Sequence, residues 1–206
     1  MSETAGTVTS HRAGRPVKPG SVGEPIEGTE VRIDTGTGEV GEVLVRGPAV
    51  MTGYWRDEDA SRAAVTPDGW FATGDVGYLD DDGYLYLVDR KKDVILRGGY
   101  TVYPREVEEA LYEHPAVQEA VVVGVPDETL GEEVAALVVL RDGVAATQAE
   151  LIAFARERVA LYKAPRLVVL APELPHGPTG KVLRREIDRE LLRGLLDDRA
   201  NDKTGA

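Results

Sequence analysis

The twenty residues from Asp89 to Glu108 combine features that do not normally share one core element. The segment opens with the charged run Asp-Arg-Lys-Lys-Asp, continues through two short apolar runs separated by Gly98-Gly99, and ends where Pro104 begins an expected helix. Proline suits a first helical position because its missing N–H has no helical partner there. A Gly-Gly pair between strand-like runs is typical of a tight turn. We therefore expect a moving or ligand-contacting segment here.

The pattern of the chain changes at this segment. Before it, alternating runs predict strands at 30–33, 41–46, 70–71, 76–78 and 84–88, a hairpin turn at 80–83, and a short helix from Asp57, its cap, to Val65. After it, strands are expected at 94–97, 101–103, 117–123, 134–140 and 166–170, with helices at 104–114, 147–161 and 184–196. The predicted fold class is α+β, with a small β-rich unit at 1–88 and a compact α+β domain at 89–206.

The expected helices carry recognisable local signals. Thr147-Gln-Ala-Glu150 has the spacing of a capping box, which predicts a helix start at that point. In the last helix, Ile187, Leu191 and Leu195 are spaced to form one apolar stripe. The residues from about 197 onward are polar, and we expect them to form a disordered tail.

Composition excludes several classes of protein. The 206 residues include no cysteine, so disulfides, thiol nucleophiles and cysteine-based zinc sites are excluded. The net charge of −12 argues against a surface that binds nucleic acid. No apolar run approaches the roughly 18 residues that a membrane span needs, and the N-terminus lacks the features of a signal peptide. We expect a cytoplasmic protein with small-molecule partners.

Single motifs have ordinary explanations when each is taken alone. Residues 36–41 match G-x-G-x-x-G, but a strand follows where a dinucleotide site needs a helix, so we interpret them as a turn. Thr73-Gly-Asp75 is compatible with a common turn or with a carboxylate that binds a ribose diol. The loop 175–181 is no Walker loop, and its Lys181 is either a solvated surface residue or a mobile positive charge for a phosphate or carboxylate. The three histidines are isolated from one another and suggest no metal site or catalytic triad.

The order and spacing of these motifs, however, resemble the adenylate-forming superfamily, which includes acyl-CoA synthetases and luciferases. The resemblance covers about residues 1 to 190 and rests on Ser2-Glu3-Thr4, Thr73-Gly-Asp75, Asp89-Arg90 with Gly98-Gly-Tyr100 and Pro104–Glu108, and Pro175 with Gly180-Lys181, together with Gly41–Pro48 and Gly53-Tyr-Trp55. The run Arg-Lys-Lys-Asp-Val-Ile and the Gly-Gly-Tyr segment are more similar to fatty-acid and aryl-acid CoA ligases than to peptide-synthetase adenylation domains.

The resemblance implies a two-step reaction with ATP, Mg²⁺ and CoA. A carboxylic acid would be joined to AMP with release of pyrophosphate, and the acyl group would then pass to the thiol of CoA. By position in the motifs, Glu3 would help to hold Mg²⁺ on the ATP phosphates and Ser2 would lie near the α-phosphate. Asp75 would bind the ribose hydroxyls of ATP or AMP, with Arg90 reaching the same nucleotide.

The later motifs imply movement between the two steps. Asp89 would be the hinge about which the C-terminal domain rotates. Lys181 would bridge the carboxylate of the acid and the α-phosphate, while Gly98, Gly99 and Tyr100 would line the pantetheine passage. A mobile lysine and a cation suit this chemistry because one anion attacks another. Glycines allow the backbone to approach a narrow ligand closely.

The family's phosphate loop, adenine pocket and acyl pocket lie upstream of the motif with which this sequence starts. We therefore expect the C-terminal part of an acid–CoA ligase, with 1–88 as the incomplete end of the large adenylation domain, Met1 as an internal methionine of a truncated chain, and no adenylation by these residues alone. Three alternatives stay open. The chain is a non-catalytic binding module for CoA, a partner chain or an acyltransferase that modifies Lys181; it is a subunit that complements a separate N-terminal half; or it is an adenylation-domain fragment that serves a carrier thiol.

Overall fold

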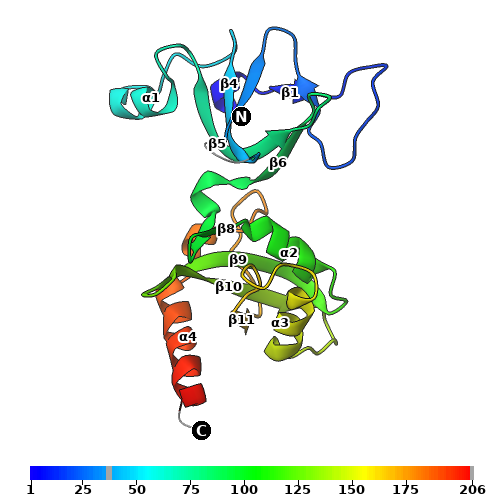
Figure 1. Ribbon diagram of the computed structural model, residues 1–206, viewed down its shortest axis with the longest axis vertical. Helices are drawn as coiled ribbons and strands as arrows, with labels where there is room; N and C mark the ends of the chain where they lie inside the picture. Colours follow the sequence, from blue (N-terminus) through cyan, green and yellow to red (C-terminus); the bar gives the residue numbers. More distant parts are fainter. Residues whose placement is uncertain (36–38, 205–206) are drawn as a thin grey trace. The chain divides into compact units, whose positions relative to one another are not determined.

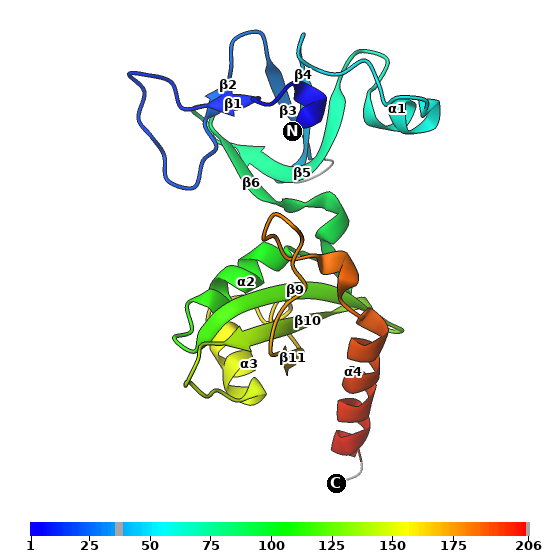
Figure 2. The same ribbon diagram turned by 180° about the vertical axis from the view of Figure 1, so that it is seen from behind.

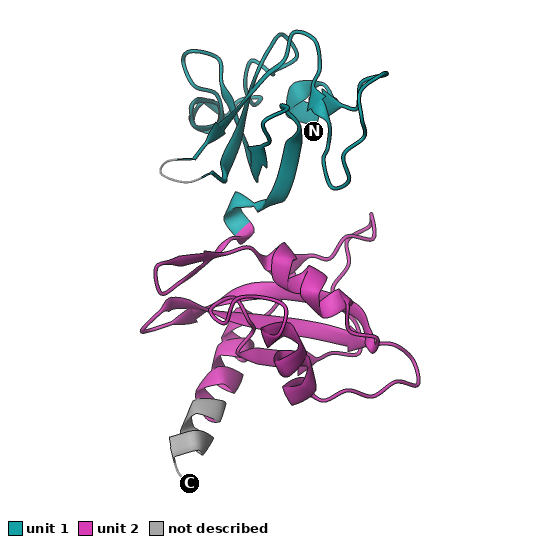
Figure 3. Ribbon diagram, turned by 45° about the vertical axis from the view of Figure 1, so that its right-hand side comes forward, with its two compact units in different colours: residues 1–92 teal, residues 93–206 magenta. Residues whose placement is uncertain are grey.

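The structure, a computed structural model, describes residues 1–35 and 39–204, with side chains described as far as residue 198. The chain divides into two compact units, Met1–Lys92 and Asp93–Ala206 (Figure 3). The α+β class expected from the sequence is confirmed. The glycine-rich residues 36–38, expected to form a turn, lie outside the described residues.

The first unit is built on an antiparallel sheet with the strand order β3-β4-β5-β6 (Figure 1). Its strands are β3 (Glu30–Asp34), β4 (Gly41–Arg46), β5 (Phe71–Leu79) and β6 (Leu85–Arg90). A second, two-stranded sheet pairs β1 (Thr9–Ser10) with β2 (Glu24–Pro25), and the short helices are η1 (Ser2–Thr4), α1 (Glu58–Ala64) and η2 (Lys91–Asp93), the last of which runs into the second unit. The small core cluster of the sheet centres on Val43, Val45 and Leu85.

In the first unit, the helix start expected at Asp57 and the hairpin turn expected at 80–83 are both confirmed. Asp57 caps α1, because its side chain accepts a hydrogen bond from the backbone N–H of Ala60. Asp80 closes the β5–β6 turn by accepting the N–H of Gly83 on its carbonyl and that of Tyr84 on its carboxylate. The two strands expected at 70–71 and 76–78 are instead one continuous strand, β5. The segment 73–75 therefore lies within a strand and not in a turn.

The second unit contains a five-stranded mixed sheet. Its strands are β7 (Ile95–Arg97), β8 (Tyr100–Val102), β9 (Val117–Asp127), β10 (Gly131–Leu140) and β11 (Leu167–Leu170). On one side, β10 pairs with β9 along its length. On its other side, β10 pairs in parallel with β11 and antiparallel with β7, and β8 continues the sheet beyond β7. Its helices are α2 (Pro104–Tyr112), α3 (Gln148–Arg156), η3 (Arg184–Glu186) and α4 (Arg189–Thr204).

Helices cover both faces of this sheet, as the two opposite views of the ribbon show (Figures 1 and 2). Alternate residues of β9 face opposite clusters: Ala120 and Val122 pack with α2 and α3, whereas Val121 and Val123 pack with α4. A strand that is buried on both faces needs apolar side chains at successive positions, which explains the run Ala-Val-Val-Val. None of the helices in the described part of the chain is long and apolar enough to cross a membrane.

Two of the helix predictions for the second unit were wrong in extent or phase. The helix expected at 147–161 ends at Arg156, although its capping box at Thr147 is confirmed. The helix expected at 184–196 is broken into η3 and α4, because Ile187 is extended and Asp188 caps the new start by accepting the N–H of Leu191. The break shifts the helix phase.

The shift changes which leucines of α4 are buried. Leu192 is 3% exposed, whereas Leu191 and Leu195, the expected core stripe, are 61% and 37% exposed. Ile187, also expected in the stripe, is buried, but it precedes α4. The backbone of α4 is helical through Thr204, where a disordered tail from about 197 was expected, and residues 205–206 lie outside the described residues.

Candidate functional site

The first unit has an open depression of about 510 Å³. Its lining includes Glu3, Glu42, Thr73, Gly74 and Arg90, so an acidic N-terminal residue and the end of β6 meet beside the middle of β5. The backbone of Glu3 is fixed because its carbonyl accepts the N–H of Met51 at 2.8 Å. Its carboxylate accepts a long hydrogen bond of 3.5 Å from Tyr54 Oη, and the neighbouring Ser2 is exposed.

Asp75 lies next to this depression in an ion pair with Arg90. The two residues are cross-strand partners of β5 and β6, and Arg90 Nε is 2.9 Å from Asp75 Oδ1. Burial raises the pKa of the Asp75 carboxyl above its ordinary value, and the charge of Arg90 opposes this rise. Thr73 fixes the segment, because its hydroxyl donates to the carbonyl of Val43 and accepts the N–H of Asp75.

Sequence reasoning did not identify Glu42 as a member of this site. One carboxylate oxygen of Glu42 accepts the N–H of Gly74 at 3.2 Å, and the other lies 2.7 Å from Lys91 Nζ. The carboxylate is mostly buried. Through these two contacts, Glu42 on β4 is connected both to β5 and to Lys91, the residue that follows β6. The signal was the pair Gly41-Glu42 in a motif that resembles the family. In the strand register Glu42 lies opposite Val76, and only its folded side chain reaches the N–H of Gly74.

Asp89 ends β6 together with Arg90, close to the division between the units after Lys92. Its carboxylate accepts the backbone N–H of Arg90 at 2.8 Å. This contact holds the Asp89 side chain against the backbone of Arg90, the last residue of β6. Arg90 is also the residue that pairs with Asp75.

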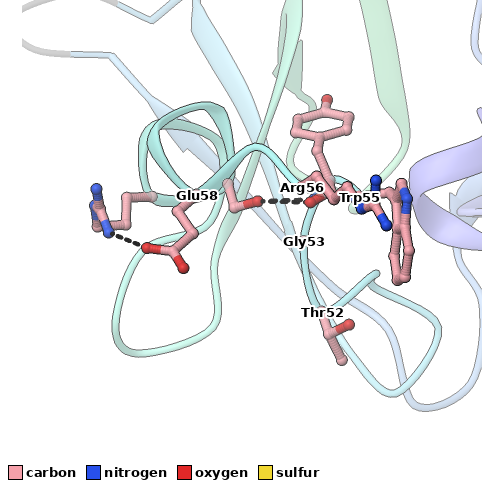
Figure 4. Close-up of a pocket in the computed structure, with 8 residues that line it drawn as sticks. Thr52, Gly53, Trp55, Arg56 and Glu58 are labelled. Atoms are coloured by element: carbon pink, nitrogen blue, oxygen red, sulfur yellow. Dashed lines mark hydrogen bonds and ion pairs between the residues drawn. The ribbon is translucent and has the colours of Figure 1, made fainter.

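A second depression of the first unit lies around the loop before α1 (Figure 4). Among its lining residues, Arg62 pairs with Glu58, and it also contacts Asp59 on the same helix. The Ser61 hydroxyl accepts the N–H of Tyr54 at 2.8 Å, which fixes the loop. No motif residue that the sequence singled out for catalysis or binding is among those that line this depression.

Gly98 and Gly99 form the two-residue turn of the β7–β8 hairpin in the second unit. Both have positive φ, 57° and 83°, as a type I′ turn requires at both central positions. Gly98 donates its N–H to the carbonyl of Leu130 at 2.8 Å. Tyr100 follows the turn, is 58% exposed, and stacks on Tyr162 with 4.7 Å between ring centroids.

Lys181 lies on a small hairpin of the second unit. An isolated bridge pairs His176 with Val182, and the N–H of Gly177 donates to the carbonyl of Lys181 at 2.8 Å. The side chain of Lys181 is exposed. Three residues later, Arg184 ties the end of the hairpin to the domain by ion pairs with Glu108 and Asp93, so an exposed lysine is carried on an anchored loop.

The structure thus groups the predicted residues by unit. Glu3 and Arg90 line one depression, with Asp75 paired to Arg90 beside it, and the turn at 98–100 and Lys181 belong to the second unit. Within the residues whose side chains are described, no group of three or more His, Asp or Glu side chains could hold a metal ion. A single carboxylate remains compatible with Mg²⁺, which is commonly held by one or two carboxylates together with substrate phosphates.

This combination of fold and motif residues is that of the AMP-binding enzymes, and the chain belongs to this adenylate-forming family. Residues 1–55 match the family model described as AMP-binding enzyme, and residues 106–181 match the AMP-binding enzyme C-terminal domain. The resemblance predicted from the sequence is therefore confirmed.

Among curated proteins, the chain is most informatively compared with acid–CoA ligases. It is 52% identical over 180 residues to a long-chain-fatty-acid–CoA ligase of Bacillus subtilis, which covers 84% of this chain and 32% of that protein. It is 46% identical over 177 residues to a 2-succinylbenzoate–CoA ligase of Geobacillus kaustophilus, covering 84% of this chain and 36% of the relative. The chain thus spans about a third of the length of the curated relatives it matches.

Solved structures of adenylate-forming enzymes are also similar to this chain. ATP-bound MatB from Rhodopseudomonas palustris is similar with a TM-score of 0.82 and 34% identity, over 89% of this chain and 38% of that one. The o-succinylbenzoate CoA synthetase MenE from Bacillus subtilis, in complex with the acyl-adenylate intermediate OSB-AMP, is similar with a TM-score of 0.78 and 37% identity, over 90% of this chain and 39% of that one.

Proposed function

We propose that the chain serves as the C-terminal part of an ATP-dependent acid–CoA ligase that acts on a fatty or related carboxylic acid. The carrying observation is the Asp75–Arg90 pair beside Glu3 in one depression of the first unit. The names of the relatives support the reaction class, since they include ligases for long-chain fatty acids and for 2-succinylbenzoate. In this proposal residues 1–88 end the adenylation domain, and residues 89–206 are the mobile domain.

The nucleotide would be held by the residues of that depression. Asp75 accepts hydrogen bonds from the two ribose hydroxyls, and Arg90 keeps the carboxylate ionised and contacts the same nucleotide. Burial raises the pKa of Asp75, and the positive charge of Arg90 opposes this rise and so favours the ionised acceptor form. Ser2 lies near the α-phosphate in this assignment.

Adenylation brings the carboxylate of the acid against the α-phosphate of ATP, which is electrostatically opposed. Glu3, a carboxylate beside the depression, would hold Mg²⁺ together with the ATP phosphates. The metal supplies charge neutralisation at the phosphates. Lys181 bridges the attacking carboxylate and the α-phosphate, and a positioned charge of this kind typically lowers a barrier by about 3–4 kcal/mol.

Thioester formation would use the β7–β8 turn. A rotation at Asp89 exchanges Lys181 for the turn, and Gly98, Gly99 and Tyr100 then line the passage of the pantetheine arm of CoA. The positive φ of both glycines fits a backbone that a narrow ligand approaches closely, since neither has a side chain in the way. A hinge at the end of a strand can absorb a large change in φ and ψ.

Lys181 would also be the point at which the enzyme is regulated. Lys181 is exposed on its hairpin, so a lysine acyltransferase could reach and neutralise the charge that adenylation needs. A separate or upstream N-terminal part would be the second partner. We place the protein in the cytoplasm, where ATP and CoA are available.

The experiment compares the 206-residue chain with a hybrid ligase. The hybrid joins the preceding two-thirds of the Bacillus subtilis relative to this chain. ATP–pyrophosphate exchange with a fatty acid is expected for the hybrid and not for the chain alone. A folded hybrid without exchange would contradict the proposed function, and robust exchange by the chain alone would contradict its assignment as one part of the catalytic unit.

A further inference from the structure

The β7–β8 turn is bordered by two side chains on the same face of the sheet. Arg97 and Tyr100 are direct cross-strand partners in the hairpin, so their side chains point to one side. Tyr100 is mostly exposed, whereas the side chain of Arg97 is 19% exposed. Of the two, only Arg97 reaches into the domain, so its contacts are the ones that could fix the position of the turn.

Arg97 is held by a carboxylate that is almost completely buried. Its guanidinium makes a two-pronged contact with Glu133, through Nε to Oε1 and through Nη2 to Oε2 at 2.9 Å. Glu133 is 1% exposed, and it also accepts the N–H of Val134 at 2.9 Å. The contact with Glu133 raises the pKa of Arg97, so the guanidinium keeps its charge. A two-pronged arginine–carboxylate pair fixes direction as well as distance.

The remaining contact of Arg97 leads to the ring on which Tyr100 stacks. Arg97 Nη1 donates to the carbonyl of Tyr162 at 3.3 Å, and the Tyr162 ring lies 4.7 Å from that of Tyr100. The segment is held separately as well, because Lys163 Nζ lies 2.7 Å from both carboxylate oxygens of Glu106 on α2. Tyr162 is thus a fixed platform, and Arg97 connects it to the hairpin.

We propose that Glu133 is a positioning residue for the β7–β8 turn, acting through Arg97 to hold Gly98, Gly99 and Tyr100 against Tyr162. Without its carboxylate, the guanidinium loses its two-pronged partner. The hairpin then keeps its contacts with β10 and the Gly98–Leu130 hydrogen bond, and Arg97 keeps only the long hydrogen bond to the Tyr162 carbonyl. The turn would then sample several positions while the sheet and helices stay folded. The value of this order to thioester formation rests on the proposed function, but the order itself does not.

The experiment measures local order in the full 206-residue chain by NMR. Amide hydrogen exchange is compared between the natural protein and Glu133→Gln, with Glu113→Gln as a matched control. Glu113 pairs with Arg158 in the same unit, but its carboxylate is 67% exposed. In Glu133→Gln the Gly98 amide is expected to lose protection by about ten-fold, and cross-peaks between the Tyr100 and Tyr162 rings should disappear, because the opening is local. Glu113→Gln should change neither.

Two results would overturn the inference. The first is an unchanged Gly98 amide and unchanged Tyr100–Tyr162 contacts in folded Glu133→Gln. The second is an equal loss of protection across β9 and β10, which would make Glu133 a residue for general stability. If Glu133→Gln does not fold, the paired substitution of Glu133→Leu with Arg97→Met removes both charges and is expected to keep the sheet while freeing Tyr100; retained order of the turn in that variant would equally contradict us.

A CoA titration separates this inference from the proposed function. In the natural protein, CoA is expected to shift the resonances of Gly98, Gly99 and Tyr100, and Glu133→Gln should weaken that binding. If CoA leaves the resonances of the natural protein unchanged, the proposed role of the turn fails. The exchange data without CoA would still decide whether Glu133 orders the turn.

Discussion

Asp75 and Arg90 lie directly opposite each other on β5 and β6, with Arg90 Nε 2.9 Å from Asp75 Oδ1. The Asp75 carboxylate is mostly buried, whereas the guanidinium is half exposed and belongs to a residue that lines the depression. The pair therefore has two measurable consequences, one for ligand binding and one for stability.

Asp75→Asn is expected to weaken ATP binding by the hybrid ligase by about 10–100-fold, because charge-assisted hydrogen bonds to the ribose would be lost. Isothermal calorimetry measures this change. Asp89→Asn serves as the control, since Asp89 is on the neighbouring strand β6 and its carboxylate accepts the backbone N–H of Arg90. An unchanged affinity in Asp75→Asn would contradict the assignment of the ribose site.

The same substitution should make the first unit more stable at neutral pH. Burial raises the folded-state pKa of Asp75 above its ordinary value of 3.8, so the ionised carboxylate disfavours folding. The natural protein should therefore lose stability relative to Asp75→Asn as the pH rises through 3.8 and then through the higher folded-state pKa. Denaturant unfolding between acidic and neutral pH tests this sign, and a stability difference that grows toward low pH would contradict it.

The two units are expected to unfold in separate transitions, with the first unit less stable. Its core cluster is small, whereas both faces of the second unit's sheet are covered by larger clusters. Both tryptophans, Trp55 and Trp70, belong to the first unit, so tryptophan fluorescence reports only that unit. Fluorescence should change at a lower denaturant concentration than far-UV circular dichroism of the helices. Coincident transitions would show that the units fold as one.

Arg184→Ala is expected to destabilise the second unit by about 2 kcal/mol, because Glu108 and Asp93 lose a charged partner in a mostly buried setting. Arg193→Ala is the matched control: its partner Glu128 is 89% exposed, and exposed pairs contribute about 0–1 kcal/mol. Circular dichroism in denaturant compares the two variants. Equal effects would mean that Arg184 does not anchor the hairpin that carries Lys181.

Much of the fold was predictable because its signals are local. Alternating residues located β3 and β4, Asp57 and Thr147 marked helix starts, and Pro104 marked α2. The phase of α4 was not predictable from spacing, since Arg184–Leu196 is compatible with a single helix until the extended backbone at Ile187 is known. Local patterns also could not separate the strand β5 from two shorter strands around Gly74.

The parts of the site that the sequence did not reveal depend on partners far apart in the chain. Glu133 follows another glutamate at the start of β10 and has the pattern of an exposed strand end. It is buried because Arg97, 36 residues earlier, pairs with it across the sheet. Glu42 likewise belongs to the candidate site only through its contacts with Gly74 and Lys91.

The central claim is that Lys181 and the β7–β8 turn serve different half-reactions, and the most direct test is to measure both steps in the hybrid ligase. Lys181→Ala should slow acyl-adenylate formation by about 10²–10³-fold. Gly99→Leu should leave adenylate formation within about threefold and slow thioester formation by about ten-fold or more. Nothing lies within 4 Å of a Cβ at Gly99, so its effect would come from the strained turn and the blocked passage. Loss of the same half-reaction in both variants would contradict the account.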